Sequence, residues 1–297
     1  MSHQTIKPSN NHNNLKIIEC PRDAMQGLHP FIPTEEKVNY LNLLLQVGFD
    51  TLDFGSFVSP KAIPQMRDTA KIVEQLDLDV SDTKLLAIVA NKRGANDAAA
   101  FEAITYLGYP FSISETFQMR NTNATITESL DRVKQIQEIC VKNEKQMVVY
   151  ISMGFGNPYG DVWNVEIVQH WVEELAKLDI DIFQLSDTVG VAQPDSIEYL
   201  FKNLIPKNPT LEIGAHFHTT PNTWEEKVAT AYENGCRRFD GVIKGFGGCP
   251  MAQDSLVGNM PSERLIQFAQ SKNESLELNL DAYKNAMIIA ERIMHHA

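Results

Sequence analysis

The chain has 297 residues, of which 43% are hydrophobic and 22% charged, a composition typical of globular proteins rather than disordered or fibrous ones. Acidic residues outnumber basic ones by 38 to 26, which gives a net charge of −12 and leaves no basic surface for a nucleic acid partner. The longest apolar runs, such as residues 85–90, are far shorter than the roughly 20 residues of a membrane-spanning helix, so an integral membrane protein is excluded.

The first fourteen residues and the cysteines bear on the cellular compartment of the protein. Residues 1–14 are rich in Asn, His and Ser and contain neither an apolar segment nor an arginine, so no secretory or mitochondrial signal is visible. We expect a flexible tail on a cytoplasmic protein. The four cysteines, at positions 20, 140, 236 and 249, form no CxxC pair, which argues against a disulfide framework and a zinc site. We expect four free thiols.

Short apolar runs rich in β-branched residues alternate with longer amphipathic stretches, which is typical of βα units around a parallel sheet. Eight strands are predicted, at 16–20, 51–57, 84–90, 111–114, 147–153, 182–186, 212–218 and 238–243. Helices are predicted between them, for example at 34–47, 125–143, 165–178 and 223–234, and several open with a Thr or Asn suited to an N-cap. Residues 278–294 carry apolar side chains at spacings of three and four, so they predict one extra amphipathic helix.

Eight βα units in roughly 250 residues match the size of a (β/α)₈ TIM barrel, an α/β fold whose functional residues follow the carboxyl ends of its strands. An open doubly wound sheet is the alternative, but it would place a glycine-rich phosphate turn after the first strand, where this chain has Pro-Arg-Asp-Ala-Met-Gln at 21–26. We therefore expect a single TIM-barrel domain over residues 15–297, including the C-terminal helix.

Two histidines at the end of the seventh predicted strand suggest a metal site. His216 and His218 are two residues apart, so their side chains project to the same side of the strand. Barrel closure makes strands 7, 8 and 1 neighbours, which brings Asp23 and Asn259 toward the same point. This nitrogen and oxygen donor set suits Mg²⁺ or Mn²⁺ better than zinc, although two buried or surface histidines without a metal remain the alternative.

Further charged residues follow other predicted strands. Arg22 precedes Asp23, and its guanidinium would bind a substrate carboxylate or stabilise an enolate oxygen; the alternative is a salt bridge at the barrel rim. Asp53 and Asp187 end strands 2 and 6 and extend the polar cluster, with helix capping as the alternative for each.

Cys249 lies in the segment Gly-Phe-Gly-Gly-Cys-Pro at 245–250, whose three glycines are typical of an active-site lid. A thiol near a metal and an arginine can exchange a proton near neutral pH, whereas the alternative is an ordinary turn cysteine. We interpret the other three cysteines as structural.

From about residue 16 to 268 the sequence resembles the hydroxymethylglutaryl-CoA lyase family, within the superfamily of metal-dependent TIM-barrel lyases and Claisen-type synthases. The matching segments are Pro-Arg-Asp-Ala-Met-Gln at 21–26, Ser-Phe-Val-Ser-Pro-Lys at 56–61, Pro-Gln-Met at 64–66, Ser-Glu-Thr-Phe at 114–117 with Asn121 and Asn123, Asp-Thr-Val-Gly at 187–190, His-x-His at 216–218, Gly-Gly-Cys-Pro at 247–250 and Gly-Asn at 258–259.

The resemblance implies a homodimeric, cytoplasmic enzyme of leucine degradation that cleaves 3-hydroxy-3-methylglutaryl-CoA to acetyl-CoA and acetoacetate. It implies that a divalent cation is held by Asp23, His216, His218 and Asn259. It assigns enolate stabilisation to Arg22, the acid on the lid to Cys249, and further catalytic roles to Asp53, Asp187 and His216. The acyl-CoA substrate would contact Gln26, Ser114, Asn121 and Asn123.

The chain departs from the family pattern at several positions. Asp53 stands where the family has glutamate, Thr219 where an acid follows the histidines, and Asp254 where the family has glycine. One extra residue lies between Cys249 and Asn259. These differences keep two alternatives open: a related metal-dependent lyase or synthase acting on another hydroxy acid or thioester, and an acyl-CoA-binding barrel without catalysis.

Overall fold

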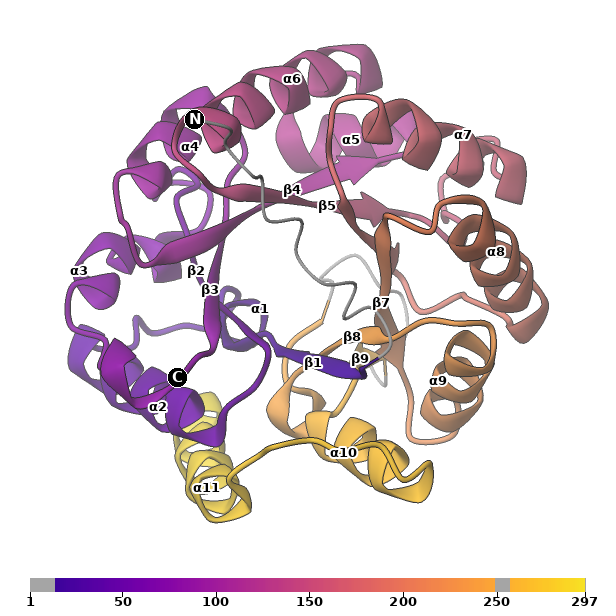
Figure 1. The fold of residues 1–297 in the computed structure, drawn as a ribbon. Coiled ribbons are helices and arrows are strands. Elements are labelled where there is room, and N and C mark those ends of the chain that lie inside the picture. The colour runs from indigo at the N-terminus through magenta and orange to yellow at the C-terminus, as the bar shows by residue number, and fades with distance from the viewer. Residues whose placement is uncertain (1–13, 249–256, 297) are drawn as a thin grey trace, which may run out of the picture.

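Eight parallel strands close into a barrel in the computed structural model, which describes residues 14–248 and 257–296 (Figure 1). Each strand pairs with the next, and β8 pairs with β1 from Lys16–Arg238 to Glu19–Gly241, which closes the ring. The strands are β1 (Lys16–Glu19), β2 (Thr51–Ser56), β3 (Lys84–Ile88), β4 (Ile104–Ser112), β5 (Gln146–Ser152), β6 (Ile182–Asp187), β7 (Glu212–Thr219) and β8 (Arg238–Gly241). The predicted (β/α)₈ barrel is confirmed.

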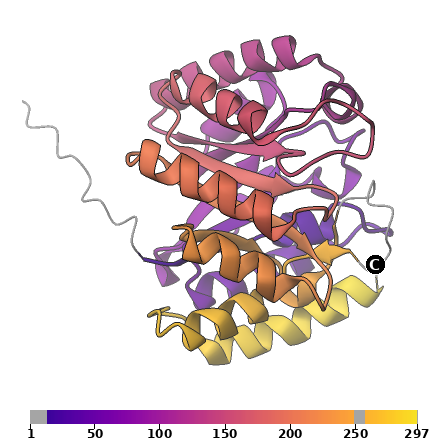
Figure 2. The ribbon, with the colours of Figure 1, turned by 90° about the vertical axis from the view of Figure 1, so that its right-hand side faces the viewer.

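Helices surround the barrel as a continuous outer layer, which the side view in Figure 2 shows lying against the strands. They are α1 (Pro21–Met25), α2 (Thr34–Val47), α3 (Thr69–Val73), α4 (Lys92–Ala99), α5 (Glu115–Thr122), α6 (Ile126–Lys142), α7 (Val165–Ala176), α8 (Pro194–Lys207), α9 (Trp224–Glu233), α10 (Ser262–Ser271) and α11 (Leu280–His296). Three short 3₁₀ turns, η1 (Pro64–Met66), η2 (Leu78–Val80) and η3 (Ile243–Gly245), lie between these elements. No described helix combines the length and apolarity needed to cross a membrane.

Local sequence explains several helix boundaries. Thr125 caps α6 by accepting the Glu128 N–H while Glu128 accepts the Thr125 N–H, a reciprocal capping box. Asn164 caps α7 by accepting the Ile167 N–H. Thr223, also predicted as a cap, makes no such bond to α9. Of the three threonines that open predicted helices, Thr125 alone caps its helix, because Thr34 is the first residue of α2, whose N-cap is Pro33.

The fourth strand is longer than predicted. The sequence predicts 111–114, whereas β4 begins at Ile104 and pairs along its length with β5, including Pro110 with Tyr150. Gly108 and Pro110 make this segment resemble a loop. Gly108 is nevertheless required inside the strand, because a Cβ there would lie 2.6 Å from the Ile88 side chain. Packing inside the barrel outweighs the local propensity.

The chain between β8 and α10 also differs from the prediction. β8 ends at Gly241 rather than at residue 243, because η3 follows with Lys244 in the left-handed region at φ 58°. A short strand not predicted from the sequence, β9 (Gly258–Asn259), runs antiparallel to β7 and pairs Asn259 with His218. This pairing brings Asn259 beside the histidine pair.

The barrel interior is divided by polarity. A buried apolar cluster from β3 to β6 fills one side and consists of Leu86, Ile88, Tyr106, Val148, Tyr150 and Ile182. On β7 and β8 the alternation of the strand instead brings polar residues together, with His216 bonded to Asp240 and Arg238 bonded to Glu212. The polar site therefore lies on the β7–β8–β1 side of an otherwise apolar barrel.

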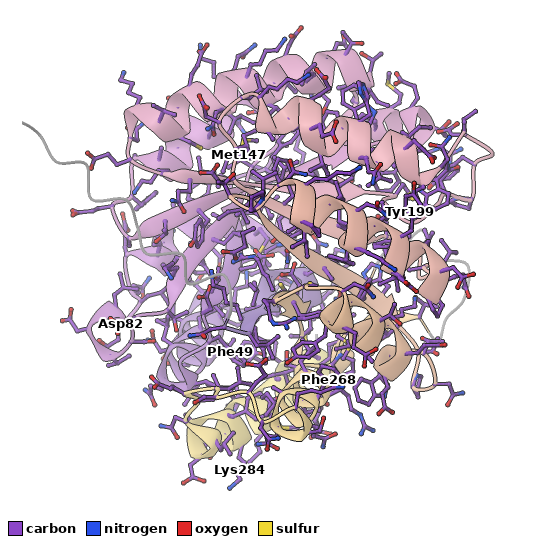
Figure 3. The ribbon with its side chains drawn as sticks, turned by 45° about the vertical axis from the view of Figure 1, so that its right-hand side comes forward. Phe49, Asp82, Met147, Tyr199, Phe268 and Lys284 are labelled. Atoms are coloured by element: carbon purple, nitrogen blue, oxygen red, sulfur yellow. The ribbon has the colours of Figure 1, made fainter. Side chains whose placement is uncertain are left out.

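The predicted C-terminal helix is present as α11 and packs against α2. Tyr283 on its inner face meets the ring of Phe49 edge to face, with centroids 6.1 Å apart. Lys284, the next residue, points outward from the same helix (Figure 3). The expected apolar face of this helix is thus buried within the chain itself.

Candidate metal and substrate site

A cavity of about 330 Å³ opens at the carboxyl ends of the strands, where a TIM barrel carries its functional residues. One wall is polar and the other largely apolar. The lining residues are Arg22, Asp23, Gln26, Val58, Ala62, Ile63, Ile88, Ala90, Pro110, Phe117, Asn121, Thr122, Tyr150, Ser152, Ser186, Thr188, His216, His218 and Gly248. The cavity therefore combines ionic groups with a surface that suits a hydrocarbon segment.

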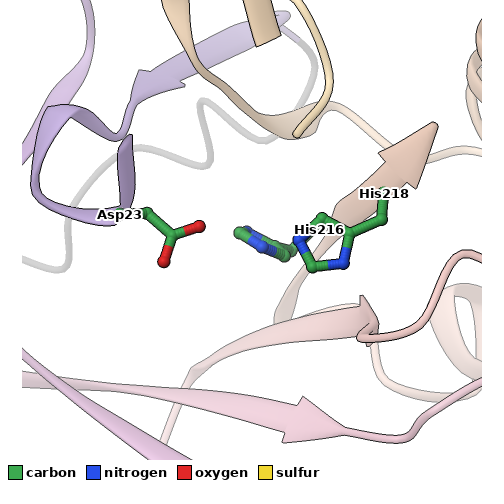
Figure 4. A group of neighbouring side chains, drawn as sticks. All are labelled: Asp23, His216 and His218. Carbon is green, nitrogen blue, oxygen red and sulfur yellow. The ribbon is translucent and has the colours of Figure 1, made fainter. Parts of the chain in front are cut away.

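Three predicted ligands meet at the polar wall. Asp23, His216 and His218 each offer one donor atom, and these atoms lie within 4.8 Å of one another. Figure 4 shows the Asp23 carboxylate facing the two imidazole rings. Strand alternation on β7 directs both histidines inward, and the short helix α1, opened by Pro21, carries Asp23 to the same place.

The hydrogen bonds of the two histidines fix which ring nitrogen is available. His216 Nδ1 donates to Asp240 Oδ2 at 2.9 Å, and His218 Nδ1 donates to the Thr188 carbonyl at 2.8 Å. In the neutral form of each ring, Nε2 therefore carries the lone pair that a metal needs. His218 Nε2 is buried and has no hydrogen-bond partner among the described residues. A divalent cation would satisfy this otherwise costly buried nitrogen.

The electrostatic environment favours the protonation states that bind metal, a neutral imidazole and a charged carboxylate, at His218 and Asp23 but not at His216. Burial lowers the pKa of His218, and the neighbouring His216 lowers it further, so its ring is neutral near pH 7. Burial opposes charge on Asp23, but Arg22, the two imidazoles and the Asn259 amide outweigh it and lower the pKa of this carboxyl. For His216, burial disfavours the charged ring, but Asp240 and Asp23 raise its pKa overall. A cation at the site would compete with that proton.

Asn259, the fourth predicted ligand, is buried and lies beside His218 through the pairing of β9 with β7. Its Nδ2 donates to the Phe246 carbonyl at 2.9 Å, which orients the amide. One carboxylate and two imidazoles form a mixed oxygen and nitrogen cluster that could hold a divalent cation.

Arg22 is the cationic group of the cavity. Its Nη1 donates to Asp23 Oδ1 at 2.9 Å and to Gln26 Oε1 at 3.0 Å, while Nε and Nη2 form a fork on Asp53. Asp53 is fully buried and does not line the cavity. Burial raises its pKa to about 6, against the opposing effect of Arg22. Asp53 thus holds the guanidinium in place from behind.

The other predicted residues fall into two groups. Gln26 and Asn121 line the cavity, and Gln26 Nε2 also donates to Asp23 at 2.6 Å. Asp187, Ser114 and Asn123 do not line it. Asp187 is bonded to Lys227 and to the Ala192 N–H, Ser114 caps α5 and donates to Asp161, and Asn123 is the exposed C-cap of α5. The sequence pattern places Asp187 and Ser114 at strand ends, and the family resemblance adds Asn123, but neither shows which way these side chains face.

Three residues that shape the site escape prediction from the sequence. Asp240 orients His216. It lies two residues after Arg238 on the eighth strand, so strand alternation could have placed both side chains on the same face of the sheet. Tyr150 lines the cavity, but its hydroxyl is buried and has no partner among the described residues. Lys227 lies on α9, and nothing in its local sequence indicates that it reaches the strand ends.

The cysteines divide as predicted as far as the structure describes them. Cys20, Cys140 and Cys236 are free and buried, and burial raises the pKa of each thiol, to about 12 for Cys140 and Cys236. These three are therefore poor nucleophiles and poor proton donors at neutral pH. Cys249 and Asp254 lie outside the described residues, as do residues 1–13 of the predicted tail.

Comparison with known sequences gives consistent relatives. The HMGL-like family profile matches residues 14–288. Hydroxymethylglutaryl-CoA lyase YngG of Bacillus subtilis is 32% identical over 269 residues, which cover 90% of this chain and 88% of the relative. The cytoplasmic 3-hydroxy-3-methylglutaryl-CoA lyase of Rattus norvegicus is 29% identical, with 85% of this chain and 73% of the relative covered.

Solved structures agree with these sequence matches. The crystal structure of the Bacillus subtilis HMG-CoA lyase superposes with a TM-score of 0.89 at 31% identity and covers 95% of this chain and 94% of that one. An HMG-CoA lyase from Acinetobacter baumannii in complex with coenzyme A and 3-methylmalate gives a TM-score of 0.86 at 28% identity, covering 97% of this chain and 93% of that one.

Proposed function

We propose how the site works from the premise that this chain belongs to the HMGL-like family and is a carbon–carbon lyase. Its reaction is the cleavage of 3-hydroxy-3-methylglutaryl-CoA into acetyl-CoA and acetoacetate. One observation supports this function above the others: Asp23, His216 and His218 converge in the same cavity as Arg22. A cleavage that leaves an enolate needs a cationic group near the thioester oxygen and a means of ionising the tertiary hydroxyl.

We propose that the cation is Mg²⁺ or Mn²⁺, held by Asp23, His216, His218 and Asn259. When bound, such an ion polarises the substrate hydroxyl and orients the adjacent carboxylate. Asp240 and the Thr188 carbonyl keep the two imidazole rings turned so that each Nε2 faces the proposed metal position.

Arg22 provides the group that distinguishes the transition state from the bound substrate. The C3 hydroxyl gives its proton to water, the bond between C2 and C3 of the acyl chain breaks, and negative charge moves onto the thioester oxygen. We propose that the second N–H of Arg22 Nη2, the one that does not donate to Asp53, receives this charge, because Asp53 and Gln26 hold the group rigid.

The enolate of acetyl-CoA must then be protonated at C2. We propose Cys249 as the acid, since the three described cysteines are buried with raised thiol pKa values. Gly247 and Gly248, which precede it, have φ values of 76° and 133° that favour glycine. Gly248, the residue directly before Cys249, lines the cavity.

Further parts of the proposal concern the wider context. We propose an acyl-CoA substrate, which the coenzyme A complex of a structural neighbour supports. Gln26 and Asn121 are its proposed contacts inside the cavity. We also propose a single catalytic domain over residues 15–297 that acts as a homodimer in the cytoplasm, in leucine degradation.

Product analysis tests the proposed reaction. Purified chain is incubated with hydroxymethylglutaryl-CoA and Mn²⁺, and the products are followed by NMR. Equal amounts of acetyl-CoA and acetoacetate are expected. If only the reverse type of reaction occurs, the condensation of acetyl-CoA with an oxo acid, the chain is a Claisen-type synthase instead. Tight binding of the substrate without any product would identify a non-catalytic acyl-CoA-binding barrel.

A further inference from the structure

Lys227 is a buried lysine next to the site that the proposed reaction does not use. Its side chain is only 5% exposed although it begins on the outer helix α9. The ammonium donates to Asp187 Oδ2 at 2.6 Å, to the His218 carbonyl at 3.0 Å and to the Gly190 carbonyl at 3.1 Å. An ammonium has three N–H donors, so every donor of Lys227 is occupied.

The three acceptors belong to the ends of two adjacent strands. Asp187 ends β6, Gly190 lies in the turn that follows it, and His218 lies near the end of β7. Between the first two lies Thr188, whose carbonyl accepts the proton of His218 Nδ1. The main chain and the ring of His218 are thus both fastened to the segment that Lys227 holds.

The charge of Lys227 is balanced where it lies. Asp187 has a fully buried side chain, and its second oxygen accepts the Ala192 N–H at 3.0 Å. The buried pair is therefore neutral, and it is complete in hydrogen bonds, which is the condition under which a buried ion pair is tolerated. It contributes a rigid connection beside the ligands without adding net charge.

We propose that Lys227 is a positioning residue for the divalent cation, and this inference rests on the metal site of the proposed function. By tying the His218 carbonyl to the β6 turn, Lys227 keeps the imidazole in the orientation in which the unpartnered Nε2 faces Asp23 and His216. Ligands held in advance bind metal more tightly, and losing a supporting partner typically weakens metal affinity by roughly 10 to 100-fold.

The test is Mn²⁺ affinity measured by titration calorimetry on the full chain. Lys227→Met keeps the length of the side chain but removes all three donors, and we expect its Mn²⁺ affinity to fall by roughly 10 to 100-fold. Lys37→Met is the matched control. Lys37 is also buried and also holds one carboxylate, Asp68, and one carbonyl, that of Gln65, but it contacts none of the three ligands. We expect the control to bind Mn²⁺ as the unmodified chain does.

A second variant keeps the test valid if Lys227→Met fails to fold. The double substitution Lys227→Met with Asp187→Asn removes both charges of the buried pair, so no uncompensated charge remains. We expect it to fold and still bind Mn²⁺ weakly, because the His218 carbonyl has lost its donor. Unchanged affinity in either folded variant, or an equal loss in Lys37→Met, would overturn the role of Lys227 alone. An unmodified chain that binds no Mn²⁺ would overturn the proposed metal site together with this inference.

Discussion

Replacing Arg22 by lysine separates positive charge from geometry at the centre of the site. The guanidinium makes a fork on Asp53 through Nε and Nη2 and spans Asp23 and Gln26 through Nη1. A lysine ammonium keeps the charge but is a point donor that cannot form the planar fork. It cannot satisfy Asp53 and still face the cavity, so the substrate oxygen loses a preorganised donor.

The size of the effect follows from the role assigned to the residue. Loss of one preorganised oxyanion donor typically lowers kcat by 10² to 10³-fold, about 2.7 to 4 kcal/mol. We expect Arg22→Lys to lie near the lower limit, about 10²-fold, because the charge is retained. KM should change little, since charge appears on the thioester oxygen only as the carbon–carbon bond breaks.

A pH profile adds a second readout. Burial raises the pKa of Asp53 to about 6 even with Arg22 paired to it. Weaker pairing with lysine raises this pKa further, so the variant should lose more activity at pH 6 than at pH 8. Steady-state kinetics of acetoacetate formation at both values measure this.

The matched control is Arg237→Lys, which changes an arginine that donates to the Tyr232 and Cys236 carbonyls and does not line the cavity. We expect its kcat to be unchanged. Near-normal kcat in Arg22→Lys would refute the assignment and make Arg22 a salt bridge of the barrel rim.

Three further substitutions test separate parts of the site and fold. Asp240→Asn removes the charge that orients His216 Nδ1, so the Mn²⁺ affinity measured by calorimetry should fall by roughly 10 to 100-fold. An unchanged affinity would show that Asp240 does not support metal binding. Cys249→Ser should keep Mn²⁺ affinity but lose most turnover, and iodoacetamide should label Cys249 before the buried thiols; full activity would transfer the acid role to His216 or water. Glu19, buried with its pKa raised to about 8, keeps a proton that the unfolded chain loses above about pH 4.5. Stability should therefore fall between pH 5 and 9, by on the order of a few kcal/mol, and less so in Glu19→Gln; equal urea midpoint shifts in both chains would disprove this.

Much of the architecture is predictable from the sequence because parallel strands and amphipathic helices carry strong local patterns. The alternation of such segments predicts the barrel, and residues 34–47 coincide with the helix found there. The fourth strand is mispredicted because Gly108 and Pro110 satisfy tertiary packing rather than strand propensity.

The site shows the same division between local and non-local information. His216 and His218 follow from strand alternation, and Asp23 joins them once the barrel closes. The direction in which Asp187 faces depends on Lys227, which is 40 residues away in sequence and comes from the outer layer of helices. No local pattern encodes that contact, so a carboxylate at a strand end can be located from the sequence while its partner cannot.

The dependence of cleavage on added metal tests the central claim most directly. The chain is stripped of metal with a chelator, and acetoacetate release from hydroxymethylglutaryl-CoA is measured as Mn²⁺ is added back. We predict negligible release without metal and a rise that saturates at one ion per chain, the number that the single cluster of Asp23, His216 and His218 in the described residues can hold. Full release from the stripped protein, unaffected by Mn²⁺, would contradict the account.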